Sequence, residues 1–156
     1  MSINMMLKGH ELFASLNVDE IDQLSTFSSV KDFRNKETIF EFDQPSTHFY
    51  MMMEGVVYLQ LPAVPVEFSF AISKAEKGEL IGISSLLNSP RYTSSARCYE
   101  DTKVLSIEAK PFRELLILNC AAGVEIMTQT AKIYFNRYTS MVKRLHDIVS
   151  QEAIAF

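Results

Sequence analysis

Residues Lys77 to Ala96 read KGELIGISSLLNSPRYTSSA and are the most informative part of this 156-residue sequence. The stretch holds Gly78 and Gly82, two of only five glycines in the chain. A glycine directly before a short helix lets backbone N–H groups converge on an anion. Arg91 follows on a predicted loop, and a guanidinium binds phosphate through paired hydrogen bonds. The stretch therefore predicts a phosphate pocket, and an arginine on a solvated turn beside a serine-rich strand is the alternative interpretation.

The candidate binding residues come from this turn and from the segment that follows it. We expect the turn to supply backbone and hydroxyl donors, Arg91 to supply a positive charge, and the later hydroxyls to support it. The candidates are Gly82, Ile83, Ser84, Ser85, Arg91, Tyr92, Thr93 and Ser94.

Short apolar or alternating runs lie on both sides of this turn, between residues 28 and 107. They fall at residues 38–40, 49–53, 56–61, 67–72, 94–98 and 104–107 and are separated by polar or Pro/Gly turns. Many short strands at close spacing predict a β-sandwich or a β-barrel over residues 28–107. The run 61–66 contains two prolines, which a central strand does not accept, so it predicts a hairpin loop.

Helices flank the predicted strands. Residues 10–27 are predicted as a helical lid, because Asn17 is a good N-cap and Glu20 stands three positions later, as in a capping box. Pro111 suits the first turn of a further helix. We expect a short helix around Phe112, a break at residues 119–123 and a longer helix to about residue 150, so that C-terminal helices cover residues 109–150.

The predicted long helix carries an apolar stripe whose steps alternate between four and three residues, the spacing of a coiled-coil seam. Its members are Met127, Ala131, Tyr134, Tyr138, Met141, Leu145 and Ile148. A helix with so wide an apolar arc has two surfaces to cover, one against its own barrel and one against a partner helix. We therefore predict a homodimer, and the alternative is that the stripe packs entirely within the subunit.

The charge balance argues against nucleic acid as a partner of this chain. The chain has 15 Lys and Arg against 19 Asp and Glu, a formal net charge of −4, whereas nonspecific binding to nucleic acid comes mostly from released counterions. No run reaches about 18 uninterrupted apolar residues, so no membrane span is predicted. Cys98 and Cys120 are far apart and outside any CxxC spacing, which predicts reduced thiols and a cytoplasmic protein.

The sequence offers no catalytic constellation. Motifs such as HExxH, GxSxG and GxGxxG are absent. The three histidines, His10, His48 and His146, lie in three different zones. This distribution disfavours the metal-dependent cupins, which are β-barrel enzymes whose metal needs several neighbouring ligands. We expect no enzyme activity, no catalytic residue and no metal site.

The order of these elements resembles the cyclic nucleotide-binding domain of catabolite-activator-type (Crp/Fnr) regulators over roughly residues 10–150. The matching segments are residues 37–40, 43, 50, 55–57, 77–79, 82, 86–87, 90–91, 100–105 and 112–116. The resemblance implies an α+β fold in a single sensor domain over residues 1–156: a jelly-roll-like antiparallel β-barrel with N-terminal helices and a long C-terminal helix. It also implies a regulatory function, in which a small molecule in the barrel shifts the placement of the long helix.

The predicted phosphate cassette departs from the family pattern at its ligand contacts. The family places a glutamate after the cassette glycine to hold the ribose 2′-hydroxyl, and this chain has Ile83 there. Arg91 resembles the phosphate-binding arginine of the family, but counting from Gly82 without a gap puts Tyr92 in that position. A hydrogen bond to a charged group contributes about 1.5 to 3 kcal/mol. We therefore expect the binding of cAMP and cGMP to be weak or lost.

The identity of the ligand and of the output stays open at this point. A cyclic nucleotide or another small anion fits a pocket with Arg91 inside, and no cofactor is assigned. If Tyr92 fills the position of the family's phosphate-binding arginine, the pocket is neutral and suits another small molecule or haem. The remaining alternative is a dimeric interaction scaffold that binds no ligand. Family transcription factors continue into a helix-turn-helix domain, which this sequence does not contain. The sensor half of a transcription regulator and a stand-alone module are therefore both kept.

Overall fold

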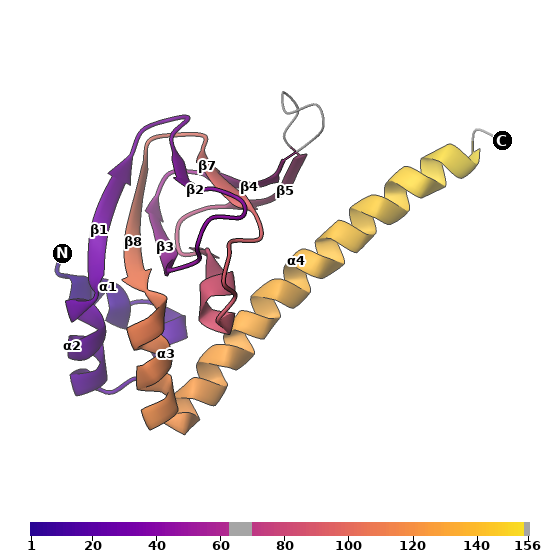
Figure 1. Ribbon diagram of the computed structural model, residues 1–156. Coiled ribbons are helices and arrows are strands. Elements are labelled where there is room, and N and C mark those ends of the chain that lie inside the picture. The colour runs from indigo at the N-terminus through magenta and orange to yellow at the C-terminus, as the bar shows by residue number, and fades with distance from the viewer. Residues whose placement is uncertain (63–69, 155–156) are drawn as a thin grey trace.

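The computed structural model describes residues 1–62 and 70–154 (Figure 1). Among these residues, eight strands form two four-stranded antiparallel sheets, in the orders β1-β8-β3-β6 and β2-β7-β4-β5. The prediction of an α+β fold with a jelly-roll-like barrel, N-terminal helices and a long C-terminal helix is confirmed. The elements are α1 Ile3–Lys8, η1 Glu11–Phe13, α2 Val18–Thr26, β1 Ser28–Phe33, β2 Thr38–Phe40, β3 His48–Glu54, β4 Val57–Leu61, β5 Phe70–Ala75, β6 Leu80–Ile81, η2 Ile83–Leu87, β7 Ser95–Cys98, β8 Thr102–Glu108, α3 Ala109–Leu118 and α4 Cys120–Ile154.

Two clusters of buried side chains stabilise the fold, one on each face of the β1-β8-β3-β6 sheet. Strands β3 and β8 are buried on both faces, and their successive side chains point to opposite faces of the sheet. Phe49 and Leu105 belong to the cluster under the helices, whereas Met52 and Val104 belong to the cluster between the two sheets. The methionine-rich run in β3 therefore fills core space on both faces of the sheet.

The N-terminal helical region contains the predicted capping box but not one continuous lid. The Asn17 side chain accepts a hydrogen bond from the Glu20 N–H at 2.9 Å, and the Glu20 carboxylate accepts one from the Asn17 N–H at 2.8 Å. Residues 14–17 separate η1 from α2, so the prediction of a helix over residues 10–27 is wrong in its middle. Helix α1 was not predicted, because its six residues are too few for an apolar period to show.

The predicted strands at residues 38–40, 49–53, 56–61, 94–98 and 104–107 agree with β2, β3, β4, β7 and β8 to within two residues. Strands β1 and β6 were not predicted. Strand β1 is mostly exposed and shows no apolar pattern, and β6 has two residues that are strand only because they pair with β3. The predicted loop at residues 61–66 and the start of the predicted strand at residues 67–72 lie largely outside the described residues, and β5 begins at Phe70.

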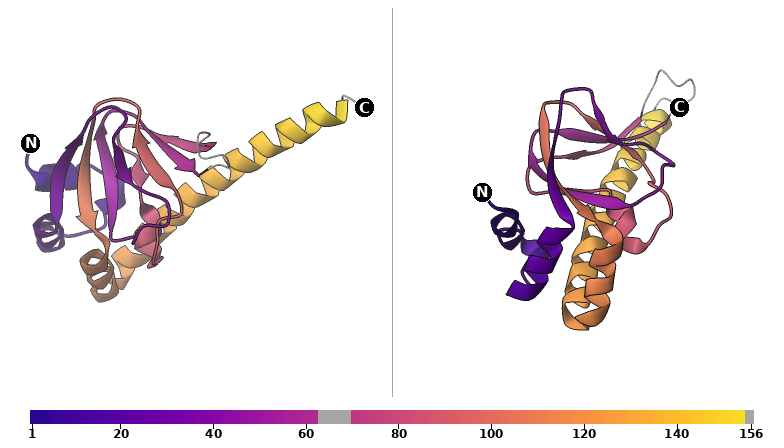
Figure 2. Two further views of the ribbon diagram at one scale, coloured as in Figure 1. Left: turned by 45° about the horizontal axis from the view of Figure 1, so that its top comes forward. Right: turned by 60° about the vertical axis from the view of Figure 1, so that its left-hand side comes forward.

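The break between the C-terminal helices is much shorter than predicted. Asn119 alone separates α3 from α4, and its side-chain oxygen accepts a hydrogen bond from the Ala122 N–H at 3.1 Å. A Cβ on Gly123 would lie 2.9 Å from the Leu116 carbonyl oxygen, so this glycine lets α3 approach the start of α4 closely. Helix α4 then passes the barrel and continues beyond it (Figures 1 and 2).

Candidate functional site

A cavity of about 210 Å³ lies between the turn after β6, the segment before β7 and the helix α4. Six of the eight predicted binding residues line it: Gly82, Ile83, Ser84, Tyr92, Thr93 and Ser94. Of its other lining residues, three were predicted for the dimer stripe, namely Tyr134, Tyr138 and Met141, and four were not predicted as binding residues, namely Phe40, Leu59, Ile72 and Arg137. The site thus combines the predicted turn with side chains of a helix far away in sequence.

Gly82 shapes the turn at the base of this cavity. Its φ of +69° lies in the left-handed region, which favours glycine. A Cβ at this position would lie 3.1 Å from the His48 carbonyl oxygen and 3.3 Å from both the Phe40 and the Tyr92 rings. The backbone therefore approaches two aromatic side chains that a larger residue would push away.

Ser85 does not line the cavity, because its hydroxyl is used inside the turn. The Ser85 Oγ is fully buried and donates to the Gly82 carbonyl oxygen at 2.9 Å. The Ser85 carbonyl oxygen in turn accepts a hydrogen bond from the Arg113 guanidinium of α3. The prediction of Ser85 as a ligand contact is thus corrected, since its polar groups hold η2 against α3.

Arg91 lies outside the cavity. Its side chain is 57% exposed, its Nη1 donates to the Asp43 carbonyl oxygen, and its Nε lies 3.9 Å from the Asp43 carboxylate. An isolated β-bridge between Arg91 and Pro45, which lies in the loop between β2 and β3, holds this arrangement. The positive charge that the sequence analysis expected from Arg91 therefore faces solvent.

Tyr92 occupies the inward position beside Gly82. Its ring is 4% exposed and stacks on Phe40 with 4.1 Å between the ring centroids. The Tyr92 hydroxyl donates to the His48 carbonyl oxygen at 2.6 Å and accepts from the His48 N–H at 3.1 Å. Because both hydrogen-bonding roles of the hydroxyl are filled, this wall of the cavity is neutral, aromatic and rigid.

A positive charge reaches the cavity from α4. The half-buried Arg137 lines it, and its Nη2 donates to the Leu80 carbonyl oxygen at 2.6 Å. Burial lowers the pKa of Arg137, while the charges of Tyr134 and Glu79 act in the opposite direction. Within the described ranges, no carboxylate lies within 4.0 Å of this guanidinium.

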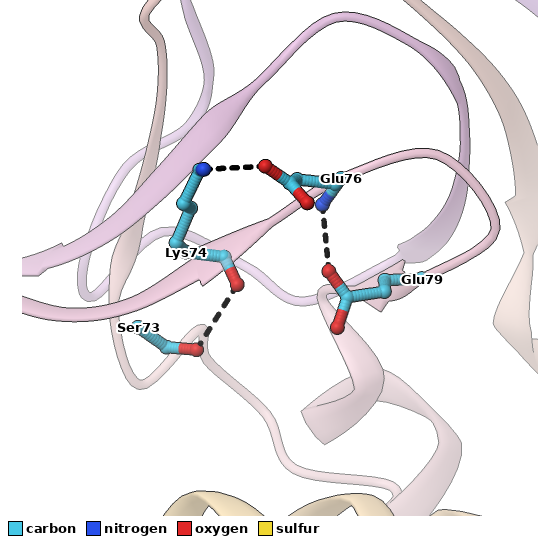
Figure 3. A network of polar contacts seen from close by, with 4 residues as sticks. All are labelled: Ser73, Lys74, Glu76 and Glu79. Atoms are coloured by element: carbon cyan, nitrogen blue, oxygen red, sulfur yellow. Dashed lines mark hydrogen bonds and ion pairs between the residues drawn. The ribbon is translucent and has the colours of Figure 1, made fainter.

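The nearby carboxylate of Glu79 is engaged elsewhere. Its Oε2 accepts a hydrogen bond from the Glu76 N–H at 2.7 Å, and the Glu76 carboxylate pairs with the Lys74 ammonium (Figure 3). Glu79 thereby closes the turn between β5 and β6. Arg137 is therefore bound to a backbone carbonyl, and no carboxylate in the described part of the chain pairs with it directly.

A second cavity of about 330 Å³ lies on the other side of Arg137, which lines both cavities together with Ile72. It is bordered by η1 and by the turn between β5 and β6, where a ring nitrogen of His10 lies 2.6 Å from the Gly78 carbonyl oxygen. Arg137 and Ile72 are therefore the wall between the two cavities.

The predicted dimer stripe on α4 is only partly exposed. Met127 and Tyr134 are half-buried and pack against the core cluster under the helices, so the barrel covers part of these two members of the predicted stripe. Ala131, Tyr138, Met141, Leu145 and Ile148 are exposed. The spacing of four and three predicted an apolar stripe correctly but not its rotation about the helix axis.

The exposed seam is rotated away from Met127 and Tyr134. It contains side chains that recur at alternating steps of four and three: Val124, Thr128, Ala131, Phe135, Tyr138, Val142, Leu145 and Val149, all exposed. The barrel-facing side of α4 has the same period, through Ile126, Thr130, Ile133 and Arg137. The two stripes lie on roughly opposite sides of the helix, so the barrel leaves the seam uncovered except beside Tyr138, which also lines the cavity.

No group of three or more His, Cys, Asp or Glu side chains among the described residues is placed to hold a metal ion. No described helix combines the length and the apolar character that a membrane crossing requires.

The chain is similar to known proteins in sequence pattern and in structure. A sequence model of the cyclic nucleotide-binding domain matches residues 30–119. No curated protein matches the chain. A putative cyclic nucleotide-binding protein from Geobacter metallireducens has a similar structure, with 26% identity and a TM-score of 0.75, over 88% of this chain and 99% of that chain.

Two further solved structures share the fold at lower identity. The sensor domain of the transcriptional regulator DNR from Pseudomonas aeruginosa has 15% identity and a TM-score of 0.72, over 83% of this chain and 91% of that chain. The regulatory subunit of a cAMP-independent protein kinase A from Trypanosoma cruzi, bound to guanosine, has 18% identity and a TM-score of 0.70, over 90% of this chain and 49% of that chain.

Proposed function

The chain belongs to the family of cyclic nucleotide-binding domains, and from this premise we propose that it is a regulatory module that senses a small molecule other than cAMP or cGMP. The proposed site is the cavity between the barrel and α4. The observation that carries the proposal is the position of Tyr92, whose ring stacks on Phe40 inside the cavity while Arg91 turns outward to Asp43.

The proposed loss of cyclic nucleotide binding follows from two missing contacts. Ile83 has no carboxylate for a ribose hydroxyl, and Tyr92 has no charge for a phosphate. Each hydrogen bond to a charged group contributes about 1.5 to 3 kcal/mol, so the loss of two weakens binding by about a hundredfold to ten-thousandfold. Guanosine in the kinase regulatory subunit from Trypanosoma cruzi supports the view that this fold accepts a ligand without the cyclic phosphate.

Calorimetry with cAMP and cGMP tests this part of the proposal. A dissociation constant weaker than about one micromolar, or no heat, is expected, and a tighter one would overturn it. Thermal melting against a panel of nucleosides, organic acids and haem tests for sensing, because a ligand that binds only the folded state raises the midpoint. If no compound raises the midpoint, the ligand-free interaction scaffold replaces the sensor.

A variant that blocks the cavity mouth shows whether a responding compound binds at the proposed site. Thr93 is exposed and lines the cavity, so Thr93→Trp narrows the entrance without disturbing the core. Arg91→Trp is the matched control, because Arg91 is an exposed neighbour outside the cavity. The midpoint shift should disappear in the first variant and persist in the second.

We also propose that two copies of the chain pair through the exposed seam of α4. The support is the continuous spacing from Val124 to Val149 on the side of the helix opposite the barrel, which fits the packing of a coiled coil. Val142→Glu should give a monomer in light scattering after size exclusion. The exposed neighbour Lys143 lies off the seam, and Lys143→Glu should leave the dimer intact. Identical masses for the Val142→Glu and Lys143→Glu variants would contradict the pairing through this seam.

The proposed role is binding rather than catalysis. The lining residues include hydroxyl groups and one guanidinium, but no histidine, cysteine or carboxylate among the described residues. Such a lining can hold and orient a ligand, whereas general acid–base catalysis most often uses a histidine or a carboxylate, and a serine or threonine nucleophile needs an adjacent base to activate it.

A further inference from the structure

Arg137 is a positive charge in a cavity wall, and none of the described carboxylates lies within 4.0 Å of it. Within the same residues its guanidinium donates one hydrogen bond, to the Leu80 carbonyl oxygen, although a guanidinium has five N–H donors. Glu79, whose negative charge acts on Arg137, is held by the Glu76 N–H. A half-buried charge is unfavourable unless an opposite charge or several hydrogen bonds compensate it. A bound anion would supply that compensation.

The rest of the cavity favours a flat ring. Phe40 and Tyr92 present a stacked aromatic pair, and Tyr134 and Tyr138 add two more rings from α4. Aromatic side chains stabilise a planar ligand by offset or edge-to-face contacts. The hydroxyls of Ser94 and Thr93 add polar contacts but no charge. Arg137 is therefore the one charged residue in a lining that is otherwise aromatic, aliphatic or neutral polar over the described residues.

The volume limits the size of the ligand. Pockets for drug-sized ligands enclose about 300 to 1,000 Å³, and this cavity encloses about 210 Å³. A single or fused aromatic ring with one small anionic group matches that space better than a full nucleotide does.

Resting on the proposed function, we propose that the sensed molecule is a small aromatic carboxylate of one or two rings, with its carboxylate on Arg137 and its ring against Phe40 and Tyr92. Arg137 comes from α4, whereas the rings of Phe40 and Tyr92 come from the barrel. One ligand would therefore contact the helix and the barrel at the same time. Its binding would therefore stabilise α4 in its place against the barrel. In this arrangement the charge partner comes from the helix and not from Arg91.

Calorimetry with paired compounds tests the proposal on the unmodified chain. Benzoate and indole-3-carboxylate are the anionic probes, and benzamide and indole-3-carboxamide are their neutral counterparts of equal shape. We expect at least one acid to bind about tenfold more tightly than its amide, because a hydrogen bond to a charged group is the stronger one. Equal binding of acid and amide, or no binding of either acid, would overturn the proposal.

Two arginine variants locate the charge partner. Arg137→Gln should abolish the preference for acid over amide, whereas Arg91→Gln should leave it unchanged. A preference that survives Arg137→Gln but disappears in Arg91→Gln would overturn the assignment. Circular dichroism confirms that each variant is folded, and the acid-to-amide ratio of the unmodified chain stands independently of both variants.

Two further probes separate this inference from the proposed function. Inorganic phosphate tests whether an anion without a ring is enough, and phosphate binding as tight as that of the acids would overturn the aromatic requirement. Adenosine tests a neutral planar ligand. If adenosine raises the melting midpoint and the acids do not, the carboxylate inference fails while sensing in the cavity stands. If no compound of the panel raises the melting midpoint, the carboxylate inference and the proposed sensing both fail.

Discussion

The replacement of Gly82 by alanine measures how tightly the turn presses on the aromatic wall of the cavity. Gly82 has a φ of +69°, and an alanine there must keep a left-handed backbone, which costs about 1 to 2 kcal/mol. The new Cβ would also lie 3.1 Å from the His48 carbonyl oxygen and 3.3 Å from the Phe40 and Tyr92 rings. Extra volume in a packed core costs about 1 to 3 kcal/mol.

Together these two effects predict that Gly82→Ala lowers the free energy of unfolding by about 2 to 5 kcal/mol. Gly78 provides a matched control in the same stretch of chain. Its φ of +86° is also left-handed, but a Cβ there would meet no atom within 4 Å. Gly78→Ala should therefore lower the free energy of unfolding only by the cost of the left-handed backbone, about 1 to 2 kcal/mol.

Urea denaturation of the two variants and the unmodified chain gives the comparison directly. Gly82→Ala should be the less stable variant, by the crowding part of about 1 to 3 kcal/mol. Equal losses in the two variants would refute the close approach of the turn to Phe40 and Tyr92. A change in the slope against urea would instead indicate a different unfolded or native state, and slopes must agree before the free energies are compared.

Three further outcomes can be measured. Tyr92→Phe removes the hydroxyl that bonds both backbone groups of His48, so urea denaturation should register a loss of about 1 to 3 kcal/mol, and a neutral result would contradict those bonds. Burial lowers the pKa of His48 from 6.5, so the unfolded chain binds the proton more tightly than the folded chain does. The free energy of unfolding should therefore decline as the pH falls below about 6.5. Unfolding curves at pH 7.5 and 5 should show that His48→Gln removes this part of the decline. Burial raises the pKa of the Cys98 thiol, whereas Cys120 is exposed. A chromogenic disulfide reagent should therefore label Cys120 at once and Cys98 only after unfolding. Fast labelling of both thiols would be inconsistent with the fold.

Local rules of the sequence predicted the parts of the fold that depend on a few neighbouring residues. The capping box of Asn17 and Glu20 places the start of α2, because both hydrogen bonds lie within one turn. The strands with buried faces, such as β3 and β8, carry an apolar signal of their own. Strand β6 is too short to show a period, since its two residues are apolar and buried but become a strand through pairing with β3.

The site was harder to predict, because its decisive contacts join residues far apart in sequence. The choice between Arg91 and Tyr92 depends on the loop that bonds Arg91 to Asp43, 48 positions away. The position of Arg137 depends on where α4 passes the barrel, which brings its guanidinium to the Leu80 carbonyl oxygen 57 positions away. Spacing along a helix gives the period of a stripe but not the surface that it meets, so it could not show that Met127 and Tyr134 pack against the core.

If two copies of the chain pair as proposed, the two stripes of α4 would connect the cavity with the partner chain. The barrel-facing stripe brings Arg137 to the cavity, and the opposite stripe exposes Phe135 and Val142, so most side chains serve only one of the two surfaces. Tyr138 is different, because it lines the cavity, is 65% exposed and belongs to the exposed seam. A ligand that changes the position of the Tyr138 ring would alter the surface available for pairing, and pairing would in turn restrict that ring. In the proposed dimer, ligand binding and pairing would be reciprocally coupled through this side chain.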